Sequence, residues 1–224
     1  MFELLLPYLR STVGAVLDVG CGDGHLIHYM SRIRPDLTYL GIDPSEEFLK
    51  IARESRPDLT YSTNFPAPSN HGNDFALVTV VAVLAHLSEH ECHVLLRDIV
   101  KCVAHAEHHV VVFELTGPIA ERGDGWNRRT LDDYLSMFRS CGLWALSARH
   151  ISYPAHNFFE RRLRPYIERR FTSEMPCSVT IRESQVRISR LLSRLILKLT
   201  RNPLARTSST SNGNTFFVLK VQGR

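Results

Sequence analysis

The stretch Val16-Leu-Asp-Val-Gly-Cys-Gly-Asp-Gly24 is the most informative part of this 224-residue chain. Its first four residues predict a buried strand, and glycines then alternate up to Gly24, just before a helical pattern that starts at His25. Glycine lets the backbone turn tightly and lie against a ligand without a Cβ in the way. Because the following helix points its free N–H groups at the same place, the stretch predicts a site for a nucleotide-like cofactor.

The spacing of these glycines narrows the class of cofactor. A dinucleotide-binding turn has its third glycine where this chain has His25, and a P-loop ends in Gly-Lys-Ser/Thr, which is absent here. The pattern Asp18-x-Gly20-x-Gly22-x-Gly24 instead resembles the first motif of the class I S-adenosylmethionine-dependent methyltransferases. Two later stretches are similar to the second and fourth strands of that family: YLGIDPS at 39–45 and DFALVTVVAVLAHL at 74–87.

An acidic residue ends the second of these strands. Asp43 lies 23 residues after Gly20, the offset at which a second strand returns beside the first. A carboxylate there accepts hydrogen bonds from ribose hydroxyls, although it also suits the start of a helix. The resemblance implies a cofactor site made by Asp18, Gly20, Cys21, Gly22, Gly24, Asp43, Pro44, Asn64 and Val81.

Two of these positions carry alternatives. Asp18 either faces the methionine amine of the cofactor or accepts hydrogen bonds from amides of the turn. The family usually has an acidic residue after its third strand for the adenine amine, but this chain has Ser62-Thr-Asn64 there. Asn64 therefore either offers its side-chain carbonyl to adenine or is only a turn residue.

Candidate residues for the acceptor side follow the later strands. The resemblance places His86 after the fourth strand, facing the transferred methyl group, where a histidine can take a proton from a hydroxyl near neutral pH. The alternative is a histidine bound to a backbone group at a helix start. Candidate acceptor contacts, which also have structural alternatives such as capping, are Glu114, His150, Tyr153 and His156. His90 and His93 continue the helical face of His86, but we expect no metal site.

Strands alternate with helices along the chain, which predicts an α/β fold with a doubly wound parallel sheet. The expected strands are 16–19, 39–42, 59–62, 75–80, 109–113, 143–151 and 215–221. The expected helices are 2–10, 25–31, 45–54, 89–104 and 130–141. The resemblance implies seven strands with the last one antiparallel, in a single methyltransferase domain over 1–224.

The charge is concentrated in one segment, residues 152–213, which we expect to be a helical insertion before the last strand. Residues 151–213 hold 12 Arg or Lys and 4 Asp or Glu, whereas the whole chain has a net charge of only +4. Within it, 183–201 predicts a basic amphipathic helix. This helix either caps the domain, docks on an anionic membrane surface, or binds phosphates of RNA or of a lipid-linked acceptor.

These features together favour one function. We expect a cytoplasmic enzyme that uses S-adenosyl-L-methionine and releases S-adenosyl-L-homocysteine, with peripheral contact at a membrane as a further hypothesis. The preferred acceptor is a hydroxyl of a small molecule or of a lipid-linked or sugar compound. The alternatives are an RNA methyltransferase that uses the basic insertion, and a non-catalytic cofactor-binding subunit that activates a partner. The odd number of cysteines, 5, favours free thiols in a reducing compartment.

Overall fold

The computed structural model describes residues 1–65, 75–103, 107–123, 125–152 and 213–222. Residues 153–212 of the predicted insertion lie outside the described residues, and with them the basic helix at 183–201, Tyr153 and His156. Residues 1–150 and 207–224 belong to one compact unit, which holds the sheet and the glycine turn.

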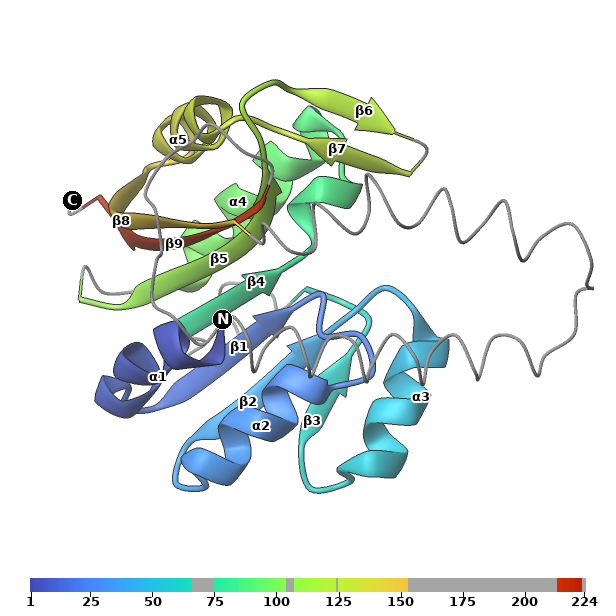
Figure 1. The fold of residues 1–224 in the computed structure, drawn as a ribbon. Coiled ribbons are helices and arrows are strands. Elements are labelled where there is room, and N and C mark those ends of the chain that lie inside the picture. Colours follow the sequence, from blue (N-terminus) through green and yellow to red (C-terminus); the bar gives the residue numbers. More distant parts are fainter. Residues whose placement is uncertain (66–74, 104–106, 124, 153–212, 223–224) are drawn as a thin grey trace, which may run out of the picture. The chain divides into compact units, whose positions relative to one another are not determined.

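A seven-stranded sheet with the order β3-β2-β1-β4-β5-β9-β8 forms the centre of this unit (Figure 1). The strands are β1 (Ala15–Val19), β2 (Thr38–Ile42), β3 (Thr60–Ser62), β4 (Phe75–Val81), β5 (His109–Thr116), β8 (Leu143–Ser152) and β9 (Gly213–Val221). The pairs from β3 to β5 are parallel, and β9 is antiparallel to β5. The predicted doubly wound sheet with an antiparallel last strand is confirmed.

Helices cover both faces of the sheet (Figure 1). One face packs on α1 (Phe2–Ser11), α2 (His25–Ile33) and α3 (Glu46–Ser55). The other face packs on α4 (Glu89–Cys102) and α5 (Leu131–Ser140). Each helix places its apolar stripe against the sheet, and the two resulting cores stabilise the three layers.

The strand order places a crossover beside the glycine turn. The chain runs from β1 outward through β2 to β3, and then returns to β4 on the other side of β1. In open α/β sheets, ligands bind outside the carboxyl ends of the strands where the order reverses in this way. The carboxyl ends of β1 and β4 are therefore the expected position of a ligand site.

Local sequence explains where most helices begin. The Ser45 side chain accepts from the Phe48 amide at the start of α3, as expected from the sequence. Capping boxes begin α4, with Ser88 and Glu91, and α5, with Thr130 and Asp133. The start of α2 differs, because its N-cap is Gly24 and no side chain caps it.

Sequence analysis missed two short elements. One is the 3-10 helix η1 (Leu84–His86), which follows β4. The other is a hairpin of β6 (Glu121–Gly123) and β7 (Trp126–Arg128), which lies between β5 and α5. The helix η1 and each strand of the hairpin are three residues long, too short for a periodic pattern. Among the described helices, none is long and apolar enough to span a membrane.

Candidate active site

The glycine turn is tied to the end of β2. The amides of Gly20 and Cys21 both donate to the carbonyl of Ile42, at 2.7 and 2.9 Å. One carboxylate oxygen of Asp43 accepts from the Gly22 amide at 2.9 Å, and the other accepts from the Ser45 amide at 2.9 Å. Asp43 therefore orders the turn, while the capping of α3, proposed as its alternative role, belongs to Ser45.

Open space lies over Gly22 and not over Gly20. Both residues have positive φ, +54° and +68°, which favours glycine. A Cβ on Gly20 would lie 2.3 Å from the Val83 side chain, so the turn after β4 covers this residue. A Cβ on Gly22 would meet no described atom within 4 Å. A ligand therefore has room against the turn at Gly22, beside Asp43.

The first turn of α2 faces this space without a side-chain cap. The helix has nine residues, His25–Ile33, its N-cap is Gly24, and its first turn has no acidic residue. The Asp23 carboxylate just before the helix accepts from the His25 amide at 3.4 Å and partly compensates the positive end of the helix dipole, to which the other first-turn amides contribute. This end suits a carboxylate or another acceptor group of a ligand.

Asp18 is the most unusual group of the site. It is 1% exposed, and one of its oxygens accepts from the Thr79 hydroxyl at 2.6 Å. The other oxygen, Oδ2, is buried with no hydrogen-bond partner among the described residues. Burial raises the pKa of Asp18 to about 7; the Thr79 hydrogen bond opposes this rise and the charge of Asp43 adds to it. A ligand ammonium or N–H would satisfy Oδ2, so the residues present fit an amino-acid portion of a cofactor.

The remaining predicted cofactor residues differ in exposure. Cys21 is buried, and burial followed by the charges of Asp18 and Asp43 raises the pKa of its thiol to about 12. Its sulfur packs over Gly41, so the side chain serves packing while its backbone belongs to the turn. Pro44 and Asn64 are exposed, and Val81 is partly buried. The role of Asn64 at adenine stays a prediction.

The structure resolves the alternatives for Glu114 in favour of capping. Its side chain is 1% exposed, and Oε1 accepts from the amides of Val83 and Leu84, both at 2.7 Å. Its Oε2 accepts from the Ala85 amide at 3.2 Å. Burial raises the pKa of Glu114 to about 7 despite these three hydrogen bonds. The carboxylate is occupied by the start of η1, because β5 ends beside β4, and the proposed acceptor contact finds no support.

The candidate base His86 is exposed at the end of η1. The carbonyl oxygen of Gly125 lies 2.8 Å from its Nδ1. Because Val83 covers Gly20, η1 and the glycine turn are neighbours at the carboxyl edge of the sheet. His86 thus has the backbone contact that was its alternative role, and its second ring nitrogen has no described partner.

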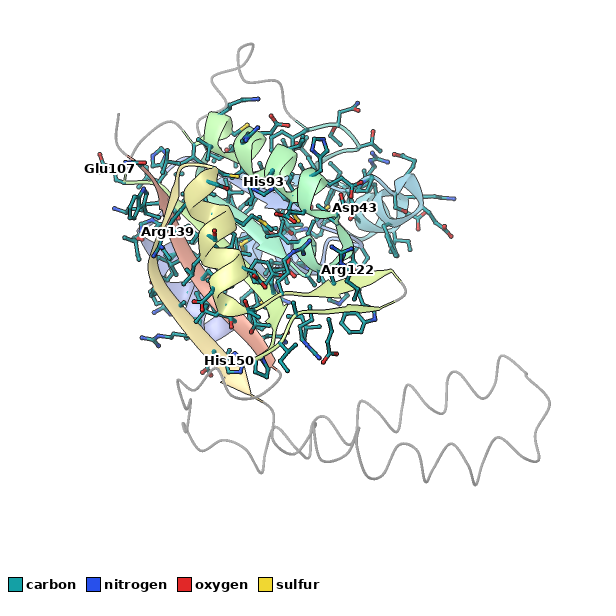
Figure 2. All side chains as sticks on the ribbon, turned by 90° about the horizontal axis from the view of Figure 1, so that it is seen from above. Asp43, His93, Glu107, Arg122, Arg139 and His150 are labelled. Atoms are coloured by element: carbon teal, nitrogen blue, oxygen red, sulfur yellow. The ribbon has the colours of Figure 1, made fainter. Side chains whose placement is uncertain are left out.

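His150 is placed elsewhere. It is 8% exposed, and its Nδ1 lies 3.2 Å from the Thr116 hydroxyl and 3.1 Å from the Thr215 hydroxyl. His150 belongs to β8 at one edge of the sheet, whereas Asp43 follows β2 next to the other edge, and Figure 2 shows the two residues apart. Its prediction as an acceptor contact is therefore not supported, because these interactions bury it among β5, β8 and β9.

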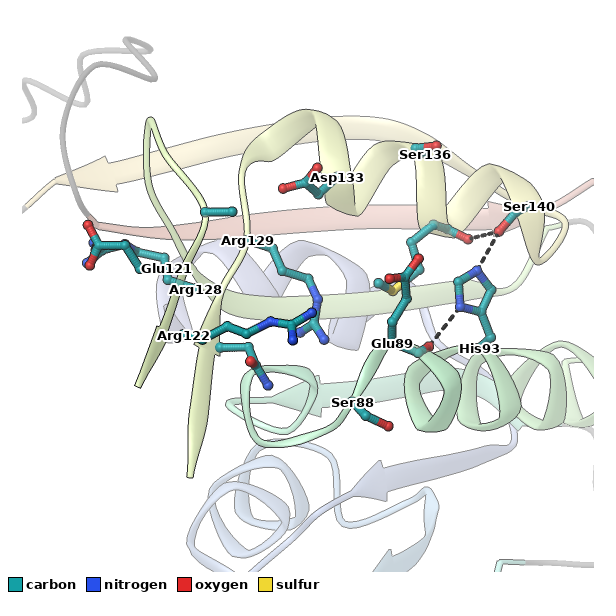
Figure 3. A pocket seen from close by; sticks show the side chains of 13 residues that line it. Ser88, Glu89, His93, Glu121, Arg122, Arg128, Arg129, Asp133, Ser136 and Ser140 are labelled. Carbon is teal, nitrogen blue, oxygen red and sulfur yellow. Dashed lines mark hydrogen bonds and ion pairs between the residues drawn. The ribbon is translucent and has the colours of Figure 1, made fainter. Parts of the chain in front are cut away.

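A pocket of about 620 Å³ lies between the start of α4, the β6–β7 hairpin and α5 (Figure 3). None of the predicted cofactor residues lines it. His93, which was considered as a metal ligand, has Nδ1 2.8 Å from the Glu89 carbonyl and Nε2 3.1 Å from the Ser140 hydroxyl. In the described part of the chain, no group of three or more candidate ligands is arranged to hold a metal ion.

Comparisons with known proteins agree with this geometry. A family model described as "Methyltransferase domain" matches residues 17–106, which contain the glycine turn, Asp43 and η1. Trans-aconitate 2-methyltransferase of Afipia carboxidovorans is 36% identical over 59 residues, 26% of this chain and 23% of that protein. Ubiquinone biosynthesis O-methyltransferase of Shewanella pealeana is 34% identical over 95 residues, 38% of this chain and 39% of that protein. The matches thus span well under half the length of these relatives.

The fold has close structural neighbours. The O-methyltransferase from a trans-AT PKS multienzyme of Brevibacillus brevis, solved with S-adenosyl-L-homocysteine, superimposes with a TM-score of 0.64 at 15% identity. That match covers 98% of this chain and 70% of the neighbour. At this identity the likeness concerns the fold alone. Residues 17–106 thus match a methyltransferase domain, and the described sheet has the Rossmann-like fold of solved S-adenosylmethionine-dependent methyltransferases.

Proposed function

We propose that this protein binds S-adenosyl-L-methionine at the glycine turn and transfers its methyl group to an oxygen acceptor. One observation carries the proposal: a buried carboxylate oxygen of Asp18 lacks a partner beside a glycine turn that is open at Gly22. Folded proteins rarely leave a buried acceptor unsatisfied, so such an atom beside an open glycine turn indicates a missing donor. The methionine ammonium of the cofactor is a donor of the right kind.

Each residue of the site has a part in holding this cofactor. Asp43 already binds two backbone amides, and its remaining lone pairs can accept from ribose hydroxyls. The uncapped start of α2 suits the methionine carboxylate. Asp18 therefore offers an acceptor for the ammonium group of the cofactor's amino acid, and the start of α2 offers donors for its carboxylate.

The proposed acceptor is a hydroxyl of a small molecule or of a lipid-linked or sugar compound. Two of the similar proteins are named O-methyltransferases, which supports oxygen as the acceptor atom. When bound, S-adenosyl-L-methionine would supply an electrophilic methyl group to the acceptor oxygen, with S-adenosyl-L-homocysteine as the leaving group. The hydroxyl proton goes to the ring nitrogen of His86 that does not face Gly125.

Contact of residues 183–201 with an anionic membrane surface is a separate part of the proposal, and it would bring the enzyme to a lipid-linked acceptor. Co-sedimentation with vesicles of phosphatidylglycerol and phosphatidylcholine tests it. Binding that requires phosphatidylglycerol and weakens with added salt is the expected result. Equal recovery with and without the anionic lipid contradicts it.

Calorimetric titration with S-adenosyl-L-methionine and S-adenosyl-L-homocysteine tests the cofactor. We expect binding to the wild type that is lost in Asp43→Ala and retained in the matched control Asp132→Ala. Asp132 is an exposed aspartate in the first turn of α5, away from the glycine turn. Absence of binding to the wild type overturns the proposal. Equal binding by both variants overturns the role of Asp43.

A further inference from the structure

Side chains form hydrogen bonds with backbone groups at both ends of the short helix η1. At its start, the Glu114 carboxylate accepts from three consecutive amides, as described above. At its end, the Arg129 guanidinium donates to the Leu84 carbonyl at 2.6 Å and to the Leu87 carbonyl at 2.8 Å. A three-residue helix has little stability of its own, so these side chains fix its position.

The β6–β7 hairpin and the residue that follows it supply the contacts at the end of η1. Arg129 directly follows β7, and its backbone is anchored to the end of β5 through a bridge with Thr116. From the same strand, the Asn127 side chain donates to the Leu87 carbonyl at 3.2 Å. The Gly125 carbonyl contacts His86 from the tip of the hairpin. Figure 1 shows β7 beside the turn that carries η1.

The segment that leads into η1 is strained. Ala82 has φ = +56°, and it is the non-glycine residue with positive φ among those described. Side chains disfavour this left-handed conformation, which persists only where the surroundings enforce it. The Ala82 amide is held by the Phe113 carbonyl at 3.0 Å. Strain of this kind commonly accompanies functional turns, so a role for the turn beyond packing is worth testing.

These contacts determine which ring nitrogen of His86 carries a proton. A carbonyl oxygen only accepts hydrogen bonds, so Nδ1 must carry a proton to bond with Gly125. In the neutral ring, Nε2 is then the unprotonated nitrogen and can act as a base. The hydrogen bond made by one ring nitrogen thereby selects the tautomer of the whole ring.

A guanidinium is well suited to bind two backbone carbonyls at once. Arg129 bridges two carbonyls with two different nitrogens, which a single lysine ammonium at the same place reproduces poorly. Its guanidinium carbon lies 5.9 Å from the centre of the Tyr134 ring. The described ion pairs include none for Arg129, so its charge is used on the η1 carbonyls.

We propose that Arg129 is a positioning residue: through η1 it holds His86 as the Nδ1–H tautomer, with Nε2 as the proton acceptor. The role of that nitrogen in catalysis rests on the proposed methyl transfer, whereas the tautomer and its dependence on Arg129 do not. The hairpin is then part of the catalytic apparatus, although it lies outside the glycine turn.

Nitrogen NMR of histidine-labelled protein at pH 8.5 tests this inference, with His86→Gln to assign the His86 signals. We expect the wild type to show protonated Nδ1 and unprotonated Nε2. Arg129→Met should shift the His86 signals toward the averaged values of free imidazole. The control Arg122→Met should match the wild type, because Arg122 lies on the same hairpin, is exposed and makes no described bond to η1 (Figure 3).

The outcomes separate the inference from the proposed function. An Nε2–H tautomer in the wild type, or unchanged signals in Arg129→Met, overturns the inference. If Arg129→Met does not fold, Arg129→Lys takes its place, and an unchanged His86 signal there also contradicts it. Titration of the same samples with S-adenosyl-L-methionine is independent. Wild-type protein with the expected tautomer but no cofactor binding overturns the proposed function alone.

Discussion

Asp18→Asn is expected to stabilise the free protein at pH 8 while it weakens cofactor binding. The Asp18 carboxylate is buried and has one unpartnered oxygen, so its ionised form is disfavoured in the folded state. The substitution keeps an oxygen that accepts from Thr79 and removes the charge. It also removes the acceptor that we assign to the cofactor's ammonium, so binding and stability should change in opposite directions.

The magnitude follows from the pKa of Asp18, which rises from 3.8 to about 7 on folding. The folded state therefore keeps its proton to higher pH than the unfolded state, and stability falls as pH rises between these two values. Ionisation of Asp18 therefore lowers the free energy of unfolding of the wild type by about 4 kcal/mol at pH 8 and by about 1.7 kcal/mol at pH 5. The introduced amide has an unpaired N–H that costs about 1–3 kcal/mol at either pH. The difference between the two pH values, about 2.5 kcal/mol, is thus independent of that cost.

Urea unfolding followed by tryptophan fluorescence measures this difference. Both tryptophans of the chain, Trp126 and Trp144, lie in the unit that contains the sheet, so the signal reports its unfolding. We expect Asp18→Asn to gain about 2.5 kcal/mol relative to the wild type as the pH is raised from 5 to 8. A gain that is the same at both pH values would refute the reasoning from burial, and undiminished cofactor binding would refute the ligand role.

Two further predictions concern the glycine turn and the start of α4. Gly20→Ala should destabilise the protein by about 1–3 kcal/mol more than Gly22→Ala, because only the former brings a Cβ against Val83. Gly22→Ala should instead lose cofactor affinity, and calorimetry with thermal unfolding of both variants would expose a reversed order. Ser88→Ala removes the capping box of α4 and should cost about 1 kcal/mol in urea unfolding. No loss in this variant would mean that tertiary packing alone holds the start of that helix.

Much of the fold was predictable because its signals are local. The seven strands of the main sheet and the five α-helices of the described residues follow from apolar periodicity, and Ser45 caps its helix as the sequence indicates. The glycine turn and Asp43 were also predictable, since each follows a strand whose end is fixed by the pattern. The hairpin and η1 were not, because elements of three residues carry no period.

The partners of the polar side chains were beyond the sequence. Asp18 meets Thr79 across 61 residues, and Glu114 reaches the Leu84 amide across 30. The alternatives for Glu114 were capping and acceptor binding, and only the adjacency of β4 and β5 decided between them. His150 was expected at the rim, but the pairing of β5 with β9 brings Thr116 and Thr215 together around it.

Local sequence patterns were enough to predict the doubly wound sheet, the glycine turn and the identity of the carboxylate at the end of β2. These features depend on the residue types of one short segment at a time, and each is written in the spacing of apolar residues and glycines. The tertiary structure alone decided which oxygen of Asp18 stays unpaired, which side of the turn is open, and how η1 is held. The reason is physical: a buried polar group is satisfied by whatever the packing of distant strands brings within hydrogen-bond distance, and local periodicity does not encode that distance.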